Sequence, residues 1–133
     1  MFSAAPLWDQ QGIALIRIIT GFFLAYHGWE LFSAEKMQGY VGWEMFKGQP
    51  LAKIMVYAGK AAELIGGLLL MIGFLTRIAS VIVACTMLYI SMFVGLGKIW
   101  YEDQHPFLFV LLALVFIFCG PGSWSLDKQV VKK

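Results

Sequence analysis

Residues 12–32 read GIALIRIITGFFLAYHGWELF, an apolar run with only two charged residues, Arg17 and Glu30. As an α-helix, a run of about 20 residues extends roughly 30 Å, which matches the hydrocarbon core of a bilayer. The run lacks the basic leader of a secretory signal and carries Arg17 in its interior. This stretch is therefore predicted to be a retained membrane span.

Three more apolar runs follow, at about 52–75, 78–96 and 104–119. Together the four runs predict a single all-α transmembrane domain, an integral membrane four-helix bundle with four antiparallel, up-down spans. The polar and aromatic segment 33–50 is predicted to lie in the membrane interface, and residues 120–133 form a polar tail. Four crossings place both termini on the same side of the membrane.

The composition agrees with this fold class. The 133 residues are 60% hydrophobic and 14% charged, whereas about a quarter of an average soluble domain is charged. The formal net charge of +2 and the dispersed basic residues give no argument for nucleic acid as a partner. The expected surroundings are the lipid bilayer, and oligomerisation stays open. Cys85 and Cys119 lie in separate apolar runs and are predicted to be small core residues.

The orientation in the membrane depends on how the basic residues are distributed between the two faces. The 10 Lys and Arg residues divide evenly between the two predicted faces, so the positive-inside rule does not decide between them. The basic tail and the basic turn at Arg77 have few acidic neighbours, which favours cytoplasmic termini.

Ionisable residues within the apolar runs are the sharpest functional signal. A charge at bilayer depth costs a few kcal/mol, so it needs a partner or a use. Three pairs have the i, i+3 spacing of neighbours on a helix: His27 with Glu30, Lys60 with Glu63, and Glu102 with His105. Because alternate spans reverse direction, these pairs predict a polar pocket between helices, near the membrane face opposite the termini. Arg17 is predicted to lie toward the other face.

Small residues predict where the helices approach closely, because lipid supplies no hydrophobic drive for helix association. On the first run, Arg17, Gly21 and Gly28 share one face. On the second run, the predicted packing face consists of Gly59, Ala62, Gly66 and Gly73.

Several short motifs together resemble a known family. They are Arg17-x3-Gly21, LAYHGW at 24–29, ELIGGL at 63–68, GFLTR at 73–77 and GPGSWSLD at 120–127. Their order over nearly the whole chain is similar to that of the DoxX family of small four-helix membrane proteins. The resemblance implies a location in the bacterial inner membrane and an association with membrane oxidoreductases, including a thiosulfate:quinone oxidoreductase. It places the family's His, Glu and Arg positions on His27, Glu63 and Arg17.

Three functions are compatible with these residues. The first is a quinone-linked subunit or partner of a membrane oxidoreductase system, in which His27 and Glu63 hydrogen-bond a quinone head group. Further candidate ligand contacts are Glu30, Lys60, Glu102 and Arg17. The sequence has no haem, iron–sulfur or nucleotide motif, so electrons would come from a partner, and whether the chain is itself an enzyme stays open.

The second function is a non-catalytic structural or assembly subunit, in which the buried charges fix the register of the helices. The third is a metal site, because bundles hold metals with inward-facing His and Glu side chains. Its candidate ligands are His27, Glu30, Glu63, Glu102 and His105.

Overall fold

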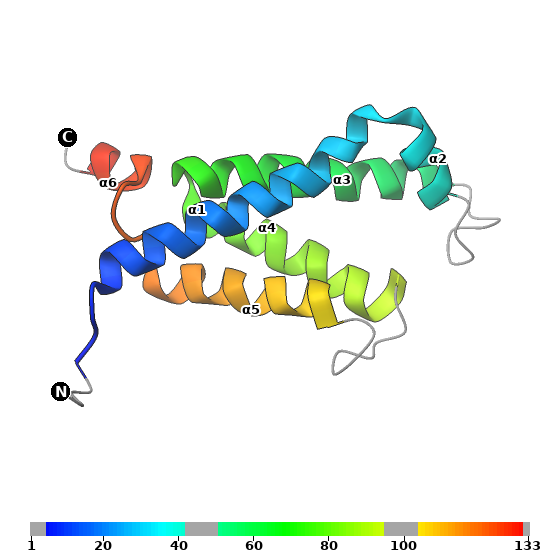
Figure 1. Cartoon of the computed structure of the whole chain (residues 1–133). Coiled ribbons are helices and arrows are strands. Elements are labelled where there is room, and N and C mark those ends of the chain that lie inside the picture. Colours follow the sequence, from blue (N-terminus) through cyan, green and yellow to red (C-terminus); the bar gives the residue numbers. More distant parts are fainter. Residues whose placement is uncertain (1–4, 42–50, 95–103, 132–133) are drawn as a thin grey trace.

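The computed structural model describes residues 5–41, 51–94 and 104–131. Its helices are α1 (Asp9–Gly28), the 3-10 helix η1 (Trp29–Phe32), α2 (Ala34–Val41), α3 (Ala52–Ile72), α4 (Thr76–Tyr89), the π-helical segment η2 (Ile90–Val94), α5 (Gln104–Cys119) and α6 (Leu126–Val131) (Figure 1). The described ranges contain no β-strand, and the all-α prediction is confirmed.

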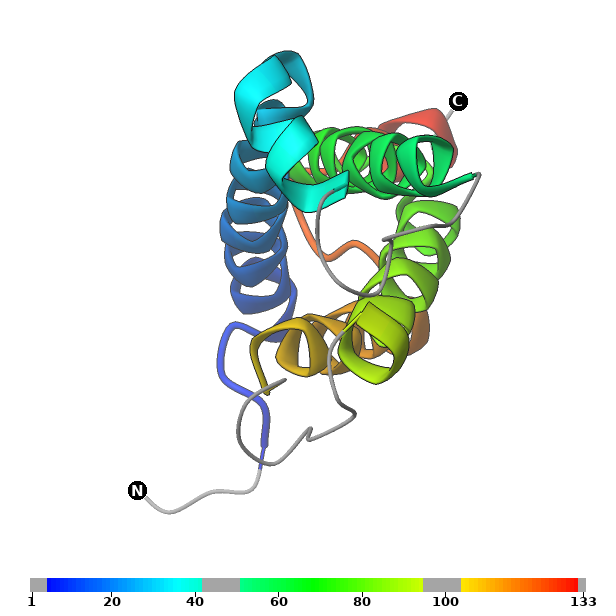
Figure 2. The same ribbon diagram turned by 90° about the vertical axis from the view of Figure 1, so that its right-hand side faces the viewer.

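Four long helices, α1, α3, α4 and α5, pack side by side around a common interior (Figure 2). The most extensive contacts are those of α1 with α3, of α3 with α4, and of α4 with α5. The start of α1, the α3–α4 turn and α6 lie at one end of the molecule, which we call the terminal end (Figure 1). The end of α1, the start of α3 and α2 lie at the opposite end, which we call the α2 end.

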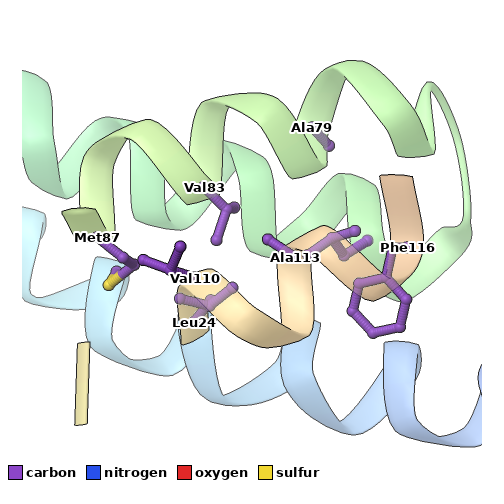
Figure 3. Packing of buried hydrophobic residues seen from close by; sticks show 8 residues of the cluster. Leu24, Ala79, Val83, Met87, Val110, Ala113 and Phe116 are labelled. Carbon is purple, nitrogen blue, oxygen red and sulfur yellow. The ribbon is translucent and has the colours of Figure 1, made fainter. Parts of the chain in front are cut away.

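The core is formed where the four long helices meet (Figure 3). The buried cluster consists of Leu24, Leu70, Ala79, Val83, Met87, Val110, Ala113 and Phe116. Many other large apolar side chains point outward, among them Phe22 on α1, Ile65 on α3 and Phe118 on α5. An outer surface of this kind is typical of helices that face lipid.

Within the part of the chain that the structure describes, two helical stretches are long and apolar enough to cross a membrane, Asp9–Phe32 and Lys53–Ile72. The stretches Thr76–Met92 and Gln104–Cys119 are apolar but shorter. The described residues therefore supply two full-length candidate spans, and the four crossings stay a prediction.

The connection between α3 and α4 differs from the expected one. The second run was expected to continue to about residue 75, but α3 ends at Ile72 because Gly73 takes a left-handed conformation with φ of 72°. The Gly73 amide donates to the Leu69 and Leu70 carbonyls, and the Phe74 amide donates to the Leu69 carbonyl. These hydrogen bonds form a C-terminal helix cap with glycine in the left-handed conformation. The turn therefore occupies residues 73–75, and Thr76 already belongs to α4.

The prediction that both cysteines fill the core is wrong. Cys85 on α4 and Cys119 at the end of α5 are free and exposed. Periodicity identified the apolar runs that contain them, but it does not show which side of a uniformly apolar helix faces the bundle.

Asp127 fixes the start of α4 from outside that helix. Its Oδ1 accepts the Leu75 amide at 2.7 Å, and its Oδ2 accepts the Thr76 amide at 2.8 Å. In the other direction, the Asp127 amide donates to the Gly73 carbonyl at 2.9 Å. The carboxylate thus satisfies amides that have no partner within α4 and lies at the positive end of the helix dipole.

We expect Asp127→Ala to lower the free energy of unfolding by about 1–2 kcal/mol, the usual cost of losing a helix cap. Denaturation in detergent, followed by circular dichroism, measures the change. Asp9→Ala is the matched control, because Asp9 is exposed and its carboxylate accepts a hydrogen bond from the adjacent Gln10 side chain. Equal stability of the two variants would show that Asp127 is no cap.

Candidate functional site

Three ionisable side chains meet at the α2 end. The Lys60 Nζ lies 3.2 Å from Glu30 Oε2 and 3.3 Å from Glu63 Oε2. The side chains of Lys60 and Glu63 are only 13% and 6% exposed, and that of Glu30 is 20% exposed. We call Glu30, Lys60 and Glu63 the charged cluster. One ammonium group is shared by carboxylates from two different elements, η1 and α3.

Glycine in the last turn of α1 allows this arrangement. A Cβ added at Gly28 would collide with the backbone nitrogen and Cα of Leu64. The end of α1 therefore lies directly on the α3 backbone, next to Glu63. Two residues further on, Glu30 in η1 comes within ion-pair distance of Lys60.

His27 lies at the edge of the charged cluster. Its side chain is exposed, and its ring centroid is 6.1 Å from that of Tyr26 in an edge-to-face arrangement. The imidazole is nevertheless close enough to the Glu63 carboxyl for the two groups to interact electrostatically. The structure thus places His27, Glu30, Lys60 and Glu63 at the same end of the bundle.

Two other candidates are placed differently. Glu102 lies outside the described residues, so its predicted place in the pocket stays a prediction. His105 is exposed at the start of α5. Within the ranges that the structure describes, no group of three or more His, Cys, Asp or Glu side chains is arranged to hold a metal ion. The described residues therefore add no support for the five-ligand metal site.

Arg17 lies at the terminal end, away from the charged cluster, as its position in the first run predicts. It is completely buried, and its guanidinium donates to carbonyls of the last turn of α3 and of the C-terminal segment 121–124. Asp127 is also within electrostatic range. These contacts describe an anchor between three parts of the chain, so we leave Arg17 outside the proposed site.

Sequence reasoning missed Lys36, whose Nζ lies 3.9 Å from Glu30 Oε1. It belongs to α2, and no helical spacing relates it to residues on α1 or α3. A surface hollow of about 230 Å³ lies beside it and is bordered by Tyr26, Trp29, Glu30, Phe32, Ser33 and Lys36. The exposed aromatic side chains at the end of the first run were the available signal for this hollow.

Comparison with known proteins gives three relatives that align over most of the chain. CatD of Bacillus subtilis, which carries a provisional name as an oxidoreductase, is 32% identical over 122 residues, covering 91% of this chain and 88% of the relative. An uncharacterized protein of Haemophilus influenzae is 30% identical over 128 residues, with 91% and 92% covered. An uncharacterized membrane protein of Mycobacterium tuberculosis is 28% identical over 152 residues, with 98% and 93% covered.

No solved structure matches the chain at a significant level. The family model described as DoxX matches residues 12–96, which include most of α1, all of α3 and α4, and the residues of the charged cluster. The apolar outer surface, the two candidate spans and a relative named as a membrane protein agree with this match. The chain therefore belongs to the DoxX family.

Proposed function

We propose that this DoxX-family membrane protein crosses the inner membrane four times and serves as a quinone-binding subunit or partner of a membrane oxidoreductase system. The 16 residues of α5 extend about 24 Å, which a locally thinned bilayer covers. Four crossings place both ends of the described chain on the same side of the membrane, and we propose that this side is the cytoplasm. The relative CatD is provisionally named as an oxidoreductase, and this name supports a redox association for the present chain.

The charged cluster is the observation that carries this proposal. Glu63 is buried on an apolar helix. Burying an ion pair costs solvation energy, and apolar side chains at the same positions would hold the helices together equally well. Ionisable groups within a membrane domain therefore indicate a functional site. His27 and Glu63 can donate or accept hydrogen bonds at a quinone oxygen and exchange protons with it. A partner protein would supply the electrons.

Titration with a soluble quinone analogue, followed by ultraviolet difference absorption, tests this proposal. We expect Glu63→Gln and His27→Ala each to weaken binding by about tenfold, the usual loss for one hydrogen bond to a charged group. Glu35→Gln and His105→Ala are the matched controls, because both residues are exposed and lie outside the charged cluster. The proposal fails if the wild type shows no saturable binding, or if all four variants bind equally well.

One observation favours the alternative, a non-catalytic assembly subunit. The pair of Lys60 with Glu30 joins α3 to η1, so the charged cluster also fixes how α1 lies against α3. In that role the cluster needs no ligand, and Glu63→Gln would leave both the assembly and the activity of the complex intact. Loss of that activity in a complex that still co-purifies would exclude the alternative.

A further inference from the structure

The hollow at the α2 end lies where the apolar stretch Asp9–Phe32 gives way to the polar helix α2. The side chains of Tyr26, Trp29 and Phe32 are 70%, 66% and 66% exposed there. The Trp29 and Phe32 rings pack edge to face, with their centroids 4.9 Å apart. Exposed aromatic rings at the end of a membrane helix are typical of the head-group region of a bilayer. The hollow therefore opens at the depth of lipid head groups.

The hollow offers both a cation and an anion. The Lys36 side chain is 62% exposed, and its Nζ is 3.9 Å from Glu30 Oε1, which is longer than a hydrogen bond. The other Glu30 oxygen, Oε2, is 3.2 Å from Lys60, so the carboxylate is held in place from the side of the charged cluster. A carboxylate accepts several hydrogen bonds, and Lys36 can donate to a phosphate.

We propose that this hollow binds the head group of phosphatidylethanolamine, with the phosphate on Lys36 and the primary ammonium on Glu30. Ser33 provides a further hydroxyl near the phosphate, since its Oγ accepts the Lys36 amide at 3.4 Å. Trp29 offers a ring face to the ammonium group. An anionic head group would be repelled by the Glu30 carboxylate, and a choline head group has no N–H to donate to it. The hollow shares Glu30 with the charged cluster, but it is not bordered by His27 or Glu63, the two quinone contacts proposed above.

Native mass spectrometry tests the proposal on the full-length protein, purified in mild detergent with equal amounts of phosphatidylethanolamine, phosphatidylcholine and phosphatidylglycerol. We expect preferential retention of one phosphatidylethanolamine. Lys36→Gln should reduce this retention about tenfold, the loss expected for one charge-assisted hydrogen bond. Lys53→Gln should leave it unchanged, because Lys53 is exposed in the first turn of α3 and does not border the hollow.

A second measurement locates the lipid. Phosphatidylethanolamine brominated near its head group should quench tryptophan fluorescence in the wild type more strongly than in Trp29→Phe. Equal retention of phosphatidylethanolamine and phosphatidylcholine, or equal losses in the two lysine variants, would overturn the proposal. Displacement of the lipid by an equimolar quinone analogue would overturn it too, by assigning the hollow to the quinone. Because these experiments need no quinone, a failure of quinone binding leaves the lipid result standing.

Discussion

Replacing Arg17 by leucine is expected to lower the free energy of unfolding by about 3–5 kcal/mol, because it leaves several backbone carbonyls without a hydrogen-bond donor, at a cost of about 1–3 kcal/mol for each one that is buried. The Arg17 side chain has no exposed surface. Its Nε donates to the Pro121 carbonyl at 2.7 Å, its Nη1 to the carbonyls of Leu70 and Met71, and its Nη2 to those of Ser123 and Trp124 at 3.1 and 3.0 Å.

The large effect follows from the number of carbonyls that Arg17 satisfies. A guanidinium has five N–H donors in a fixed planar arrangement, and each of the five hydrogen bonds given above ends on a backbone oxygen. Two of these oxygens belong to the last turn of α3, where helix carbonyls lack intrahelical partners and form the negative end of the dipole. Arg17→Lys should also be destabilising, because an ammonium has three donors and cannot reproduce this geometry.

Thermal unfolding in detergent, followed by circular dichroism, measures the loss. Arg77→Leu is the matched control, since Arg77 is exposed and its Nε donates to the Ile117 carbonyl at the longer distance of 3.2 Å. For the control we expect a change within about 0.5 kcal/mol, as for most surface substitutions. Arg17→Leu with wild-type stability would show that the C-terminal segment is held by other contacts.

The end of the bundle at which Arg17 lies was predictable from the sequence, but its hydrogen-bond partners were not. Its place in the first apolar run put it toward the face that carries the termini, and the structure has it at the terminal end. Its hydrogen-bond acceptors are backbone carbonyls 53 to 107 residues away in the sequence. Carbonyls are common to all residues, so no side-chain pattern marks the ones that a buried arginine reaches.

For the charged cluster, the sequence predicted more of the arrangement than it did for the Arg17 contacts. Helical spacing and the reversal of alternate spans placed His27, Glu30, Lys60 and Glu63 near one end. Spacing also suggested that His27 pairs with Glu30, whereas in the structure Glu30 pairs with Lys60 across the helices. That choice depends on how closely α1 approaches α3, and this distance is set by glycines.

For the packing face of α3, the prediction was right in kind but incomplete. Gly66 does pack closely, against Val83 of α4. Gly59 has nothing within 4 Å of an added Cβ, although it shares the predicted face. Gly67 was not assigned to that face, yet it meets α1 at Ala25 and Gly21. Because α3 contacts helices on two sides, a single small-residue stripe does not describe its packing.

Alanine at Gly28 or Gly67 is expected to destabilise the protein by about 3 kcal/mol, at the upper end of the cost of overpacking. A Cβ at Gly67 would lie 2.5 Å from the Ala25 nitrogen and 2.7 Å from the Gly21 oxygen. At Gly28 the collision is with backbone atoms of Leu64. Backbone atoms cannot rotate away as a side chain does, so α1 and α3 must move apart. Thermal unfolding in detergent measures the change.

The same helices provide the controls. Gly12→Ala in α1 and Gly59→Ala in α3 add a Cβ that meets nothing within 4 Å, and alanine favours a helix over glycine by about 1 kcal/mol. These two variants should be as stable as the wild type or more so. Separation of α1 from α3 in Gly28→Ala should also pull Glu30 away from Lys60, so quinone affinity should fall even at temperatures where the variant is folded. If Gly28→Ala matches Gly59→Ala in both stability and affinity, the close approach of α1 to α3 does not hold the charged cluster together.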